Sequence, residues 1–194
     1  LLLLFLALAA MQPFISSGDE RAEYLPILID CSASMSALDE VGGTSRIDAA
    51  KAEVRKLIEN MLPDQRIALI SISNSARRLT DFTDNQRVLL DALDEVEVSD
   101  VLSRLDEGLQ MAQGLCQTML TQGMTVDRVL IYSDGNFPGQ IDFELPFKID
   151  YQRIDPGGPN IGITALNARQ IGLGEWEVFV RVETTTGHET EGTV

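Results

Sequence analysis

Three oxygen-bearing side chains follow an apolar run near the start of the chain. Asp30, Ser32 and Ser34 come directly after the apolar run of residues 25–29, with one residue between each. A short apolar run of this kind is typical of a buried strand. The sequence therefore predicts one carboxylate and two hydroxyl groups at the carboxyl end of a buried strand. Such hard oxygen donors are the ligands that Mg²⁺ prefers.

A second carboxylate follows another apolar run, far along the chain. Residues 129–132 are followed directly by Ser133 and Asp134. If this strand neighbours the one before Asp30, the two carboxylates repel each other when both are ionised, and a divalent cation relieves that repulsion. We therefore expect a Mg²⁺ site, with Mn²⁺ or Ca²⁺ as alternative cations. Its place would be the sheet edge where open α/β folds bind ligands.

The elements that position these residues alternate between strands and helices. Nearly continuous apolar runs predict buried parallel strands within residues 25–29, 67–72 and 129–132. Apolar residues at helical spacing predict helices over residues 47–61, 88–96 and 103–121. Strands and helices in this order predict an α/β fold with an open, mostly parallel sheet.

Two further strands are predicted at the sides of this sheet. Residues 77–82 follow residues 67–73 too closely for a crossover helix, so we expect an antiparallel edge strand there. On the other side, residues 147–154 are the next strand candidate, and the span before them has no helical periodicity. This side of the sheet is predicted to be abbreviated.

A different pattern begins after the Pro- and Gly-rich residues 155–159, which mark a boundary. Apolar residues then recur with period two, as Trp176, Val178, Val180 and Val182 do. Two or three strands with one apolar face are not stable alone. We therefore expect residues 160–194 to begin a β-sandwich, after an α/β domain at residues 22–154.

The first ten residues are all apolar, and the chain does not begin with Met. A membrane-spanning helix needs roughly 20 such residues. Residues 1–13 are therefore interpreted as part of a transmembrane helix or, alternatively, as a signal segment. The acidic stretch at residues 19–23 places the following domain on the non-cytoplasmic, periplasmic side by the positive-inside rule.

Charge and cysteine content exclude several classes of function. Thirty acidic against fifteen basic residues give a net charge of −15, which repels nucleic-acid backbones. Cys31 and Cys116 are too few and too widely spaced for a disulfide framework or a zinc site, so we expect two small buried residues. Neither nucleic acid nor a small-molecule substrate is a predicted partner.

The motifs resemble the metal-ion-dependent adhesion site of von Willebrand factor type A domains. The D-x-S-x-S signature of that family is complete here as Asp30, Ser32 and Ser34. The family has a Thr at the start of the helix before the fourth strand, where this chain has Ser103, which keeps the hydroxyl group. The Asp after the fourth strand matches Asp134. The resemblance thus implies five metal ligands.

This resemblance also implies a doubly wound, Rossmann-like sheet in the strand order 3-2-1-4-5, with the strands before Asp30 and Asp134 adjacent. It implies that a protein partner offers a carboxylate to an open position on the metal. Asp39, Glu40 and the acidic residues 94–100 would then shape the rim of the site. The apolar start, this domain and the β-rich end together look like the aerotolerance-type (Bat) membrane proteins of bacteria, which would make the chain membrane-anchored.

Each proposed ligand also has a purely structural interpretation. Ser103, with Asp106 three residues later, is a good helix cap. Ser32 and Ser34 could satisfy backbone groups of a loop, and Asp134 followed by Gly is a common turn. All of them coinciding at strand ends favours a site, although a site that keeps the fold and binds no metal stays an alternative.

Three other functional classes compete with a non-catalytic binding module. A scaffold would use the domain only to connect the membrane to the β-rich segment. A Mg²⁺-dependent phosphoryl transferase would need cationic groups around the phosphoryl group, and Arg104 is the nearest candidate in the sequence. A serine hydrolase is disfavoured, since the sole histidine is His188 and no G-x-S-x-G motif is present. We therefore expect no enzymatic activity.

Overall fold

A computed structural model provides the structure of this chain. It describes residues 23–38, 43–137, 144–154 and 161–184. The N-terminal segment at residues 1–13, the boundary at residues 155–159, and Asp39, Glu40 and His188 lie outside the described residues.

A five-stranded sheet forms the centre of the main domain, in the order β3-β2-β1-β4-β5. All neighbouring strands are parallel except β2 and β3, which pair antiparallel at one edge. This confirms the strand order and the antiparallel edge strand that were expected. The strands are β1 (Tyr24–Asp30), β2 (Arg66–Ile72), β3 (Ala76–Arg78), β4 (Arg128–Ser133) and β5 (Lys148–Arg153).

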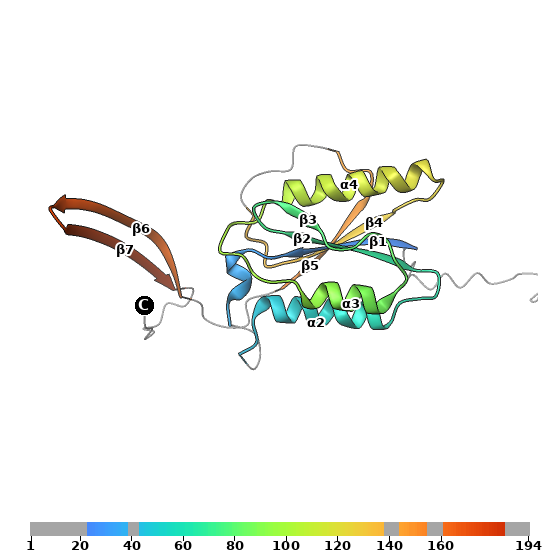
Figure 1. Cartoon of the computed structure of the whole chain (residues 1–194), viewed down its shortest axis with the longest axis horizontal. Coiled ribbons are helices and arrows are strands. Elements are labelled where there is room, and N and C mark those ends of the chain that lie inside the picture. The colour runs from blue at the N-terminus through green and yellow to red at the C-terminus, as the bar shows by residue number, and fades with distance from the viewer. Residues whose placement is uncertain (1–22, 39–42, 138–143, 155–160, 185–194) are drawn as a thin grey trace, which may run out of the picture.

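Helices cover both faces of this sheet, which makes the domain a three-layer α/β structure. Figure 1 shows α4 (Leu105–Thr121) on one face, and α2 (Arg46–Glu59) and α3 (Gln86–Asp94) on the other. A short 3₁₀ turn, η1 (Ala33–Ser36), follows β1. All three predicted helices are present. Ser45 caps α2, because its Oγ accepts a hydrogen bond from the Asp48 N–H.

Strand alternation divides the core into two layers. Ile27 and Ile29 of β1 pack with α2 and α3, whereas Leu28 between them packs with α4. In β4, Leu130 and Tyr132 face the first layer, and Val129 and Ile131 face the second. Because side chains alternate along a strand, Asp30 and Ser133, at the ends of β1 and β4, are directed to the α4 side.

Close packing brings α4 against the carboxyl ends of the central strands. A Cβ atom added to Gly108 of α4 would lie 2.6 Å from Cδ1 of Ile72 and 3.2 Å from Cδ2 of Leu28. The missing side chain therefore lets the first turns of α4 approach β1 and β2. This approach brings the residues just before α4 up to the end of β1.

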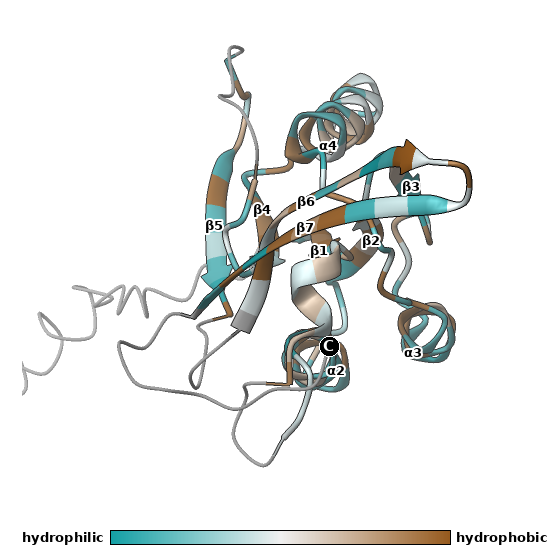
Figure 2. Cartoon of the chain, turned by 90° about the vertical axis from the view of Figure 1, so that its left-hand side faces the viewer, coloured by the Kyte–Doolittle hydropathy of each residue, from teal (hydrophilic) through white to brown (hydrophobic). Residues whose placement is uncertain are grey.

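The hairpin of β6 (Ile161–Gly172) and β7 (Glu175–Thr184) forms a separate two-stranded antiparallel sheet. Its two-residue turn contains Gly174 at a positive φ of 81°, as tight hairpins require. Residues that pair across the two strands, such as Leu166 with Val180 and Ala168 with Val178, give the hairpin one apolar face. Figure 2 shows that hydrophobic and hydrophilic residues are mixed along both strands.

One detail of the hairpin differs from strict alternation. A register shift between Ile163 and Ala165 places Ala165 opposite Arg181 rather than on the apolar side. The extra residue of a β-bulge reverses the side on which the following residues lie. Ile163 and Ala165 therefore lie on opposite faces of the hairpin, although they are two residues apart.

One further prediction concerns the two cysteines. Cys31 and Cys116 are both buried and unbridged, which confirms that they are small buried residues. None of the helices within the described ranges combines the length and apolar composition needed to cross a bilayer.

Candidate metal centre

Asp30 is fully buried at the end of β1 and is surrounded by uncharged donors. Its Oδ1 accepts hydrogen bonds from the Ser32 N–H at 2.9 Å and from the Ser103 hydroxyl, and its Oδ2 accepts one from the Ser133 hydroxyl at 2.5 Å. No ion pair within the described residues involves this carboxylate. A buried carboxylate group thus lies among neutral oxygen and nitrogen donors.

Ser103 does not cap α4. The N-cap position belongs to Arg104, which makes no side-chain capping bond. The Ser103 hydroxyl, fully buried, instead lies between Asp30 Oδ1 and the carbonyl oxygen of Ile72, the latter 3.2 Å away. The structural interpretation of Ser103 as a helix cap is therefore wrong, and its hydroxyl belongs to the cluster around Asp30.

The two serines of the first motif direct their hydroxyls to each other. Ser32 Oγ and Ser34 Oγ are 3.1 Å apart, and Ser32, the N-cap of η1, makes no side-chain capping bond. Ser32 is buried and Ser34 is half-buried. Among the described residues, neither hydroxyl is paired with a backbone group, and the contact of this segment with Asp30 is made by the Ser32 N–H.

Asp134 has a different environment, on the α2 side. Its Oδ2 accepts a hydrogen bond from Arg46 Nη1 at 2.6 Å, and the side chains of Arg46 and Asp134 are only 7% and 4% exposed. Its Oδ1 accepts the Asn136 N–H at 3.1 Å, and Gly135 adopts φ 89°, so the turn interpretation of Asp134 holds as well. Asp134 is linked to Asp30 through Ser133, the residue before it.

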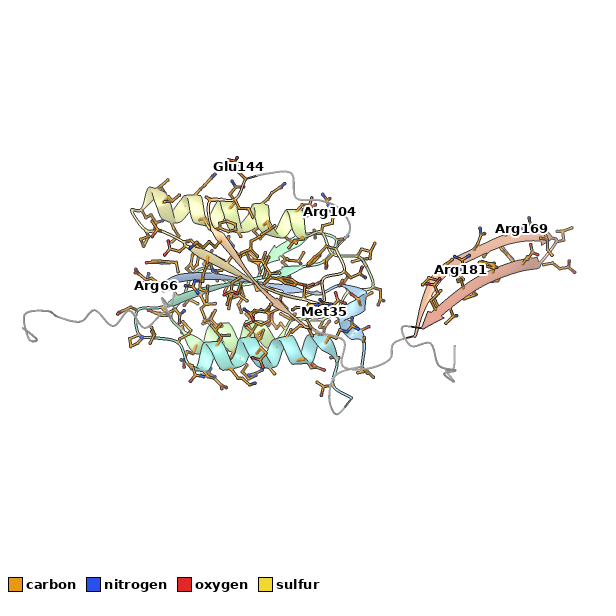
Figure 3. All side chains as sticks on the ribbon, turned by 180° about the vertical axis from the view of Figure 1, so that it is seen from behind. Met35, Arg66, Arg104, Glu144, Arg169 and Arg181 are labelled. Carbon is orange, nitrogen blue, oxygen red and sulfur yellow. The ribbon has the colours of Figure 1, made fainter. Side chains whose placement is uncertain are left out.

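Arg104, the cation expected nearest the site, is bound elsewhere. Its guanidinium pairs with Asp106 at 2.8 Å and Glu107 at 2.6 Å on the surface of α4. The hydrogen bond from Arg104 lowers the pKa of the Asp106 carboxyl. Figure 3 shows Arg104 and Met35 at the carboxyl-end edge of the sheet, with Arg66 at the opposite edge.

Two residues of the cluster were not singled out as site residues from the sequence. Ser133 could have been found from strand alternation, because it follows Val129 and Ile131 on the face that also carries Asp30. Arg46 gave a weaker signal. A cation in the first turn of a helix opposes the helix dipole, so a buried Arg at that position needs an anionic partner.

Cys31 lies next to the cluster in an environment that disfavours its thiolate form. Burial, followed by the negative charge of Asp30, raises the pKa of its thiol to about 11. The neutral thiol is a poor nucleophile and a poor metal ligand. The chemistry of this edge therefore depends on carboxylates and hydroxyls.

This donor set fits a hard cation. Within the described residues, no three His, Cys, Asp or Glu side chains gather to hold a metal, so the carboxylates need hydroxyl groups beside them. Asp30, Ser32, Ser34 and Ser103 supply only oxygen side-chain donors, the type that suits Mg²⁺. Asp134 would complete the set, although Arg46 is already bound to it.

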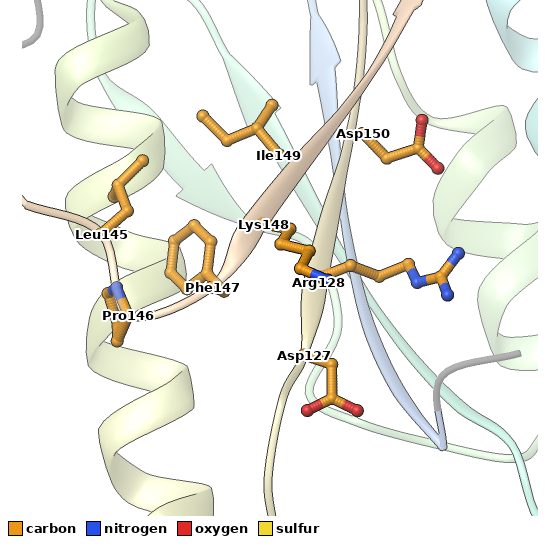
Figure 4. A pocket seen from close by; sticks show the side chains of 8 residues that line it. All are labelled: Asp127, Arg128, Leu145, Pro146, Phe147, Lys148, Ile149 and Asp150. Atoms are coloured by element: carbon orange, nitrogen blue, oxygen red, sulfur yellow. The ribbon is translucent and has the colours of Figure 1, made fainter. Parts of the chain in front are cut away.

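An open pocket of about 820 Å³ lies at the opposite edge of the sheet. Figure 4 shows Asp127 and Arg128 at the start of β4 and Lys148 and Asp150 on β5 around it. Charges of both signs line this pocket, and it contains no hydroxyl cluster. Its position at the amino ends of the strands separates it from the Asp30 cluster.

Sequence comparison gives a direct result for the main domain. The family model described as von Willebrand factor type A domain matches residues 25–136, more than half of the chain. The chain belongs to this family. Type A domains are commonly protein-interaction modules and are usually non-catalytic. No curated protein matches the chain as a relative.

Solved structures share the fold at low sequence identity. An aerotolerance-related membrane protein from Bacteroides fragilis is 15% identical, covers 81% of this chain and 80% of its own, and has a TM-score of 0.56. BatB from Bacteroides thetaiotaomicron is 19% identical with a TM-score of 0.52, and the match covers 60% of this chain and 56% of BatB. The VWA domain of SpRpn10 is 23% identical, with coverage of 61% and 63% and a TM-score of 0.53.

Proposed function

We propose that this chain is a protein-binding module that contacts its partner through a divalent cation. The cation is Mg²⁺, with Mn²⁺ or Ca²⁺ able to take its place. It is held by Asp30, Ser32, Ser34, Ser103 and Asp134. A carboxylate of the partner protein completes its coordination.

The observation that carries this proposal is the burial of Asp30 among neutral donors. Removing a carboxylate from water is expensive unless it is paired with a cation or binds a metal. Hydroxyl groups of Ser103 and Ser133 and the Ser32 N–H reduce this cost without neutralising the charge. A divalent cation beside Asp30 would supply the missing positive charge.

The three serines of the proposed ligand set suit this cation for a physical reason. Mg²⁺ requires six oxygen atoms at short distance, and uncharged hydroxyls leave part of its charge uncompensated. The remaining positive charge would attract one more anion from outside. Because the chain carries a net charge of −15, an acidic partner is repelled elsewhere on the surface. The cation would thus be the point where a partner carboxylate can bind.

The same geometry supports a binding role without catalysis. Phosphoryl transfer needs cationic groups directed at the reacting phosphoryl group. Arg46 and Arg104 are instead bound to carboxylates of the chain, and the pKa of Cys31, at about 11, keeps its thiol neutral. The role of the site is therefore to hold a cation and present it to a partner.

Metal binding is tested first on the purified chain, with Mn²⁺ as the probe. Electron paramagnetic resonance of free Mn²⁺ gives the dissociation constant, and competition with Mg²⁺ gives the affinity of the natural ion. Asp30→Asn should abolish binding. Asp127→Asn, which changes an exposed carboxylate at the opposite edge, should leave it unchanged. Equal binding by the wild-type and Asp30→Asn proteins would falsify the site.

Partner recognition is tested with peptides that differ in one group. A peptide with a single Asp or Glu should bind in Mg²⁺ and be released by EDTA, and its Asn or Gln counterpart should not bind. If both peptides bind equally well with and without Mg²⁺, the domain acts as a scaffold whose contacts do not use the metal.

We also propose that the chain is membrane-anchored through residues 1–13, with the type A domain on the periplasmic side and residues 160–194 starting a β-sandwich. The fold shared with the aerotolerance-related membrane protein supports this placement. In spheroplasts of a bacterial host, protease added outside should degrade the membrane-bound chain. Protection until the membrane is lysed would place the domain in the cytoplasm instead.

A further inference from the structure

Arg46 is an unusual residue in the layered domain. It is the first residue of α2, its side chain is 7% exposed, and its guanidinium reaches a carboxylate 88 residues later in the sequence. The start of α2 does not need this side chain, because the Ser45 hydroxyl caps the helix by accepting the Asp48 N–H. A buried cation at the positive end of a helix dipole is unfavourable by itself. The position of Arg46 is therefore explained by what it binds.

What Arg46 binds is one of the five proposed metal ligands. Its Nη1 lies 2.6 Å from Asp134 Oδ2, while the other oxygen of Asp134 accepts the Asn136 N–H at 3.1 Å. Both oxygens of this carboxylate are thus engaged within the chain. The other carboxylate of the site, Asp30, has only neutral donors among the described residues. The two halves of the site therefore differ in charge.

A guanidinium and a divalent cation cannot both lie close to Asp134 without repelling each other. In a buried, low-dielectric setting this repulsion is strong. A cation that uses Asp134 must therefore displace Arg46 or bind more weakly because of it. Arg side chains have long, flexible stems, so the guanidinium can move away while its backbone stays at the start of α2.

We propose that Arg46 is an internal competitor of the metal, which neutralises Asp134 in the metal-free protein and lowers the affinity of the site for divalent cations. This inference rests on the proposed function. Arg46 then determines the cation concentration at which the module becomes competent to bind its partner. It acts on the metal through Asp134, as a residue that tunes specificity and affinity.

The test compares Mn²⁺ affinity in variants that change charge and shape separately. Arg46→Gln removes the positive charge and keeps a hydrogen-bond donor, and it should bind Mn²⁺ at least about tenfold more tightly. Arg46→Lys keeps the charge and should stay within about threefold of the wild type. Arg55→Gln changes an exposed arginine of the same helix and should have no effect.

A second measurement follows Arg46 itself. In ¹⁵N spectra of the arginine Nε–H groups, the Arg46 signal should be protected from exchange without metal and should shift and broaden when Mg²⁺ is added, with the Arg55 signal unchanged. This measurement uses the wild-type protein, so it does not depend on whether the Arg46→Gln variant folds well.

The possible results separate this inference from the proposed function. If neither the wild type nor Arg46→Gln binds Mn²⁺, both proposals are wrong. If both bind with equal affinity and the Arg46 signal does not respond to Mg²⁺, the metal site stands and the competitor is rejected. Binding by Arg46→Gln alone would support the competitor and show that Arg46 closes the site in the natural chain.

Discussion

Asp30 ends β1 and Asp134 directly follows the neighbouring parallel strand β4, yet the two carboxylates face different layers of the protein. Asp30 is enclosed on the α4 side by the hydroxyls of Ser103 and Ser133. Asp134 is bound on the α2 side by the guanidinium of Arg46. One carboxylate is thus held by neutral donors and the other by a full positive charge, although both lie at the same edge of the sheet.

This difference teaches how a fold can prepare a binding site without making it unstable. Two buried carboxylates without cations would destabilise the domain strongly. With Arg46 on Asp134, one negative charge is compensated when no metal is present. The hydroxyl groups that donate to Asp30 lower the free-energy cost of burying its carboxylate. They do not neutralise its charge, which stays available to an incoming cation.

The largest change in stability is expected when Asp134 is removed. Asp134→Ala leaves the buried Arg46 without this counter-ion, so the free energy of unfolding should fall by about 3 kcal/mol. The double variant Asp134→Ala with Arg46→Met should recover most of that loss, because neither member of this ion pair is then left buried without its partner. Urea unfolding in the presence of EDTA measures both.

The matched control for this variant is a more exposed ion pair between α2 and α3. Asp94→Ala breaks the pair between Arg55 and Asp94, whose side chains are 38% and 60% exposed, and should cost less than about 1 kcal/mol. If Asp134→Ala is no more destabilising than Asp94→Ala, then Arg46 and Asp134 do not form the buried pair described above.

A smaller change is expected in the Asp30 half of the site. Ser103→Ala removes the hydroxyl that donates to Asp30 and lies near the Ile72 carbonyl, so unfolding should become easier by about 1–2 kcal/mol. Mn²⁺ affinity should fall by about tenfold or more, as expected for loss of one metal ligand. Ser103→Thr, which keeps the hydroxyl, should retain most of the affinity. Full Mn²⁺ affinity in Ser103→Ala would remove this residue from the ligand set.

Ser133 tests the role of a hydroxyl that binds Asp30 but is not a proposed metal ligand. Its hydroxyl donates to Asp30 Oδ2 at 2.5 Å and accepts the Gly135 N–H at 3.0 Å. Ser133→Ala should therefore destabilise the fold by about 1 kcal/mol. Because Ser133 is not one of the five proposed ligands, Mn²⁺ affinity should change less than in Ser103→Ala. A larger loss of affinity than in Ser103→Ala would make Ser133 a ligand in its place.

The sequence was sufficient to predict the layered fold because each element carries its own local pattern. Three apolar runs located the parallel strands, and helical spacing located α2, α3 and α4. The resemblance of the motifs to type A domains added the strand order, which spacing alone does not determine. The family match at residues 25–136 and the sheet topology confirm both.

The candidate site was less predictable, for a reason that Arg46 makes clear. Residues within a motif, such as Asp30 and Ser32, are neighbours in the sequence, whereas Arg46 and Asp134 are brought together by the packing of α2 against the sheet. The contact between Arg46 and Asp134 depends on the rotation of the first turn of α2 about the helix axis. The spacing of apolar residues defines that rotation only approximately. The β-bulge after Ile163 is a similar case, because one extra residue leaves no clear signal in a period-two pattern.

The smallest expected effect is a change in cysteine ionisation, which reports the charge of Asp30 directly. Burial raises the pKa of both thiols to about 11, but the negative charge of Asp30 contributes only at Cys31. Asp30→Asn should therefore lower the pKa of Cys31 and leave that of Cys116 unchanged, and Asp134→Asn should affect neither. The rate of alkylation as a function of pH, measured for each cysteine by mass spectrometry, gives both values.

The sign of the associated stability change follows from the direction of these shifts. Because the folded thiols hold their protons more strongly than the unfolded ones, whose pKa is about 9.0, the stabilisation is complete below pH 9 and is lost as the pH rises towards 11. With Asp30→Asn, the Cys31 share of this loss should shrink. An unchanged pKa of Cys31 in Asp30→Asn would mean that Asp30 carries no charge in the folded protein. The contrast between a neutrally solvated Asp30 and an ion-paired Asp134 would then have to be abandoned.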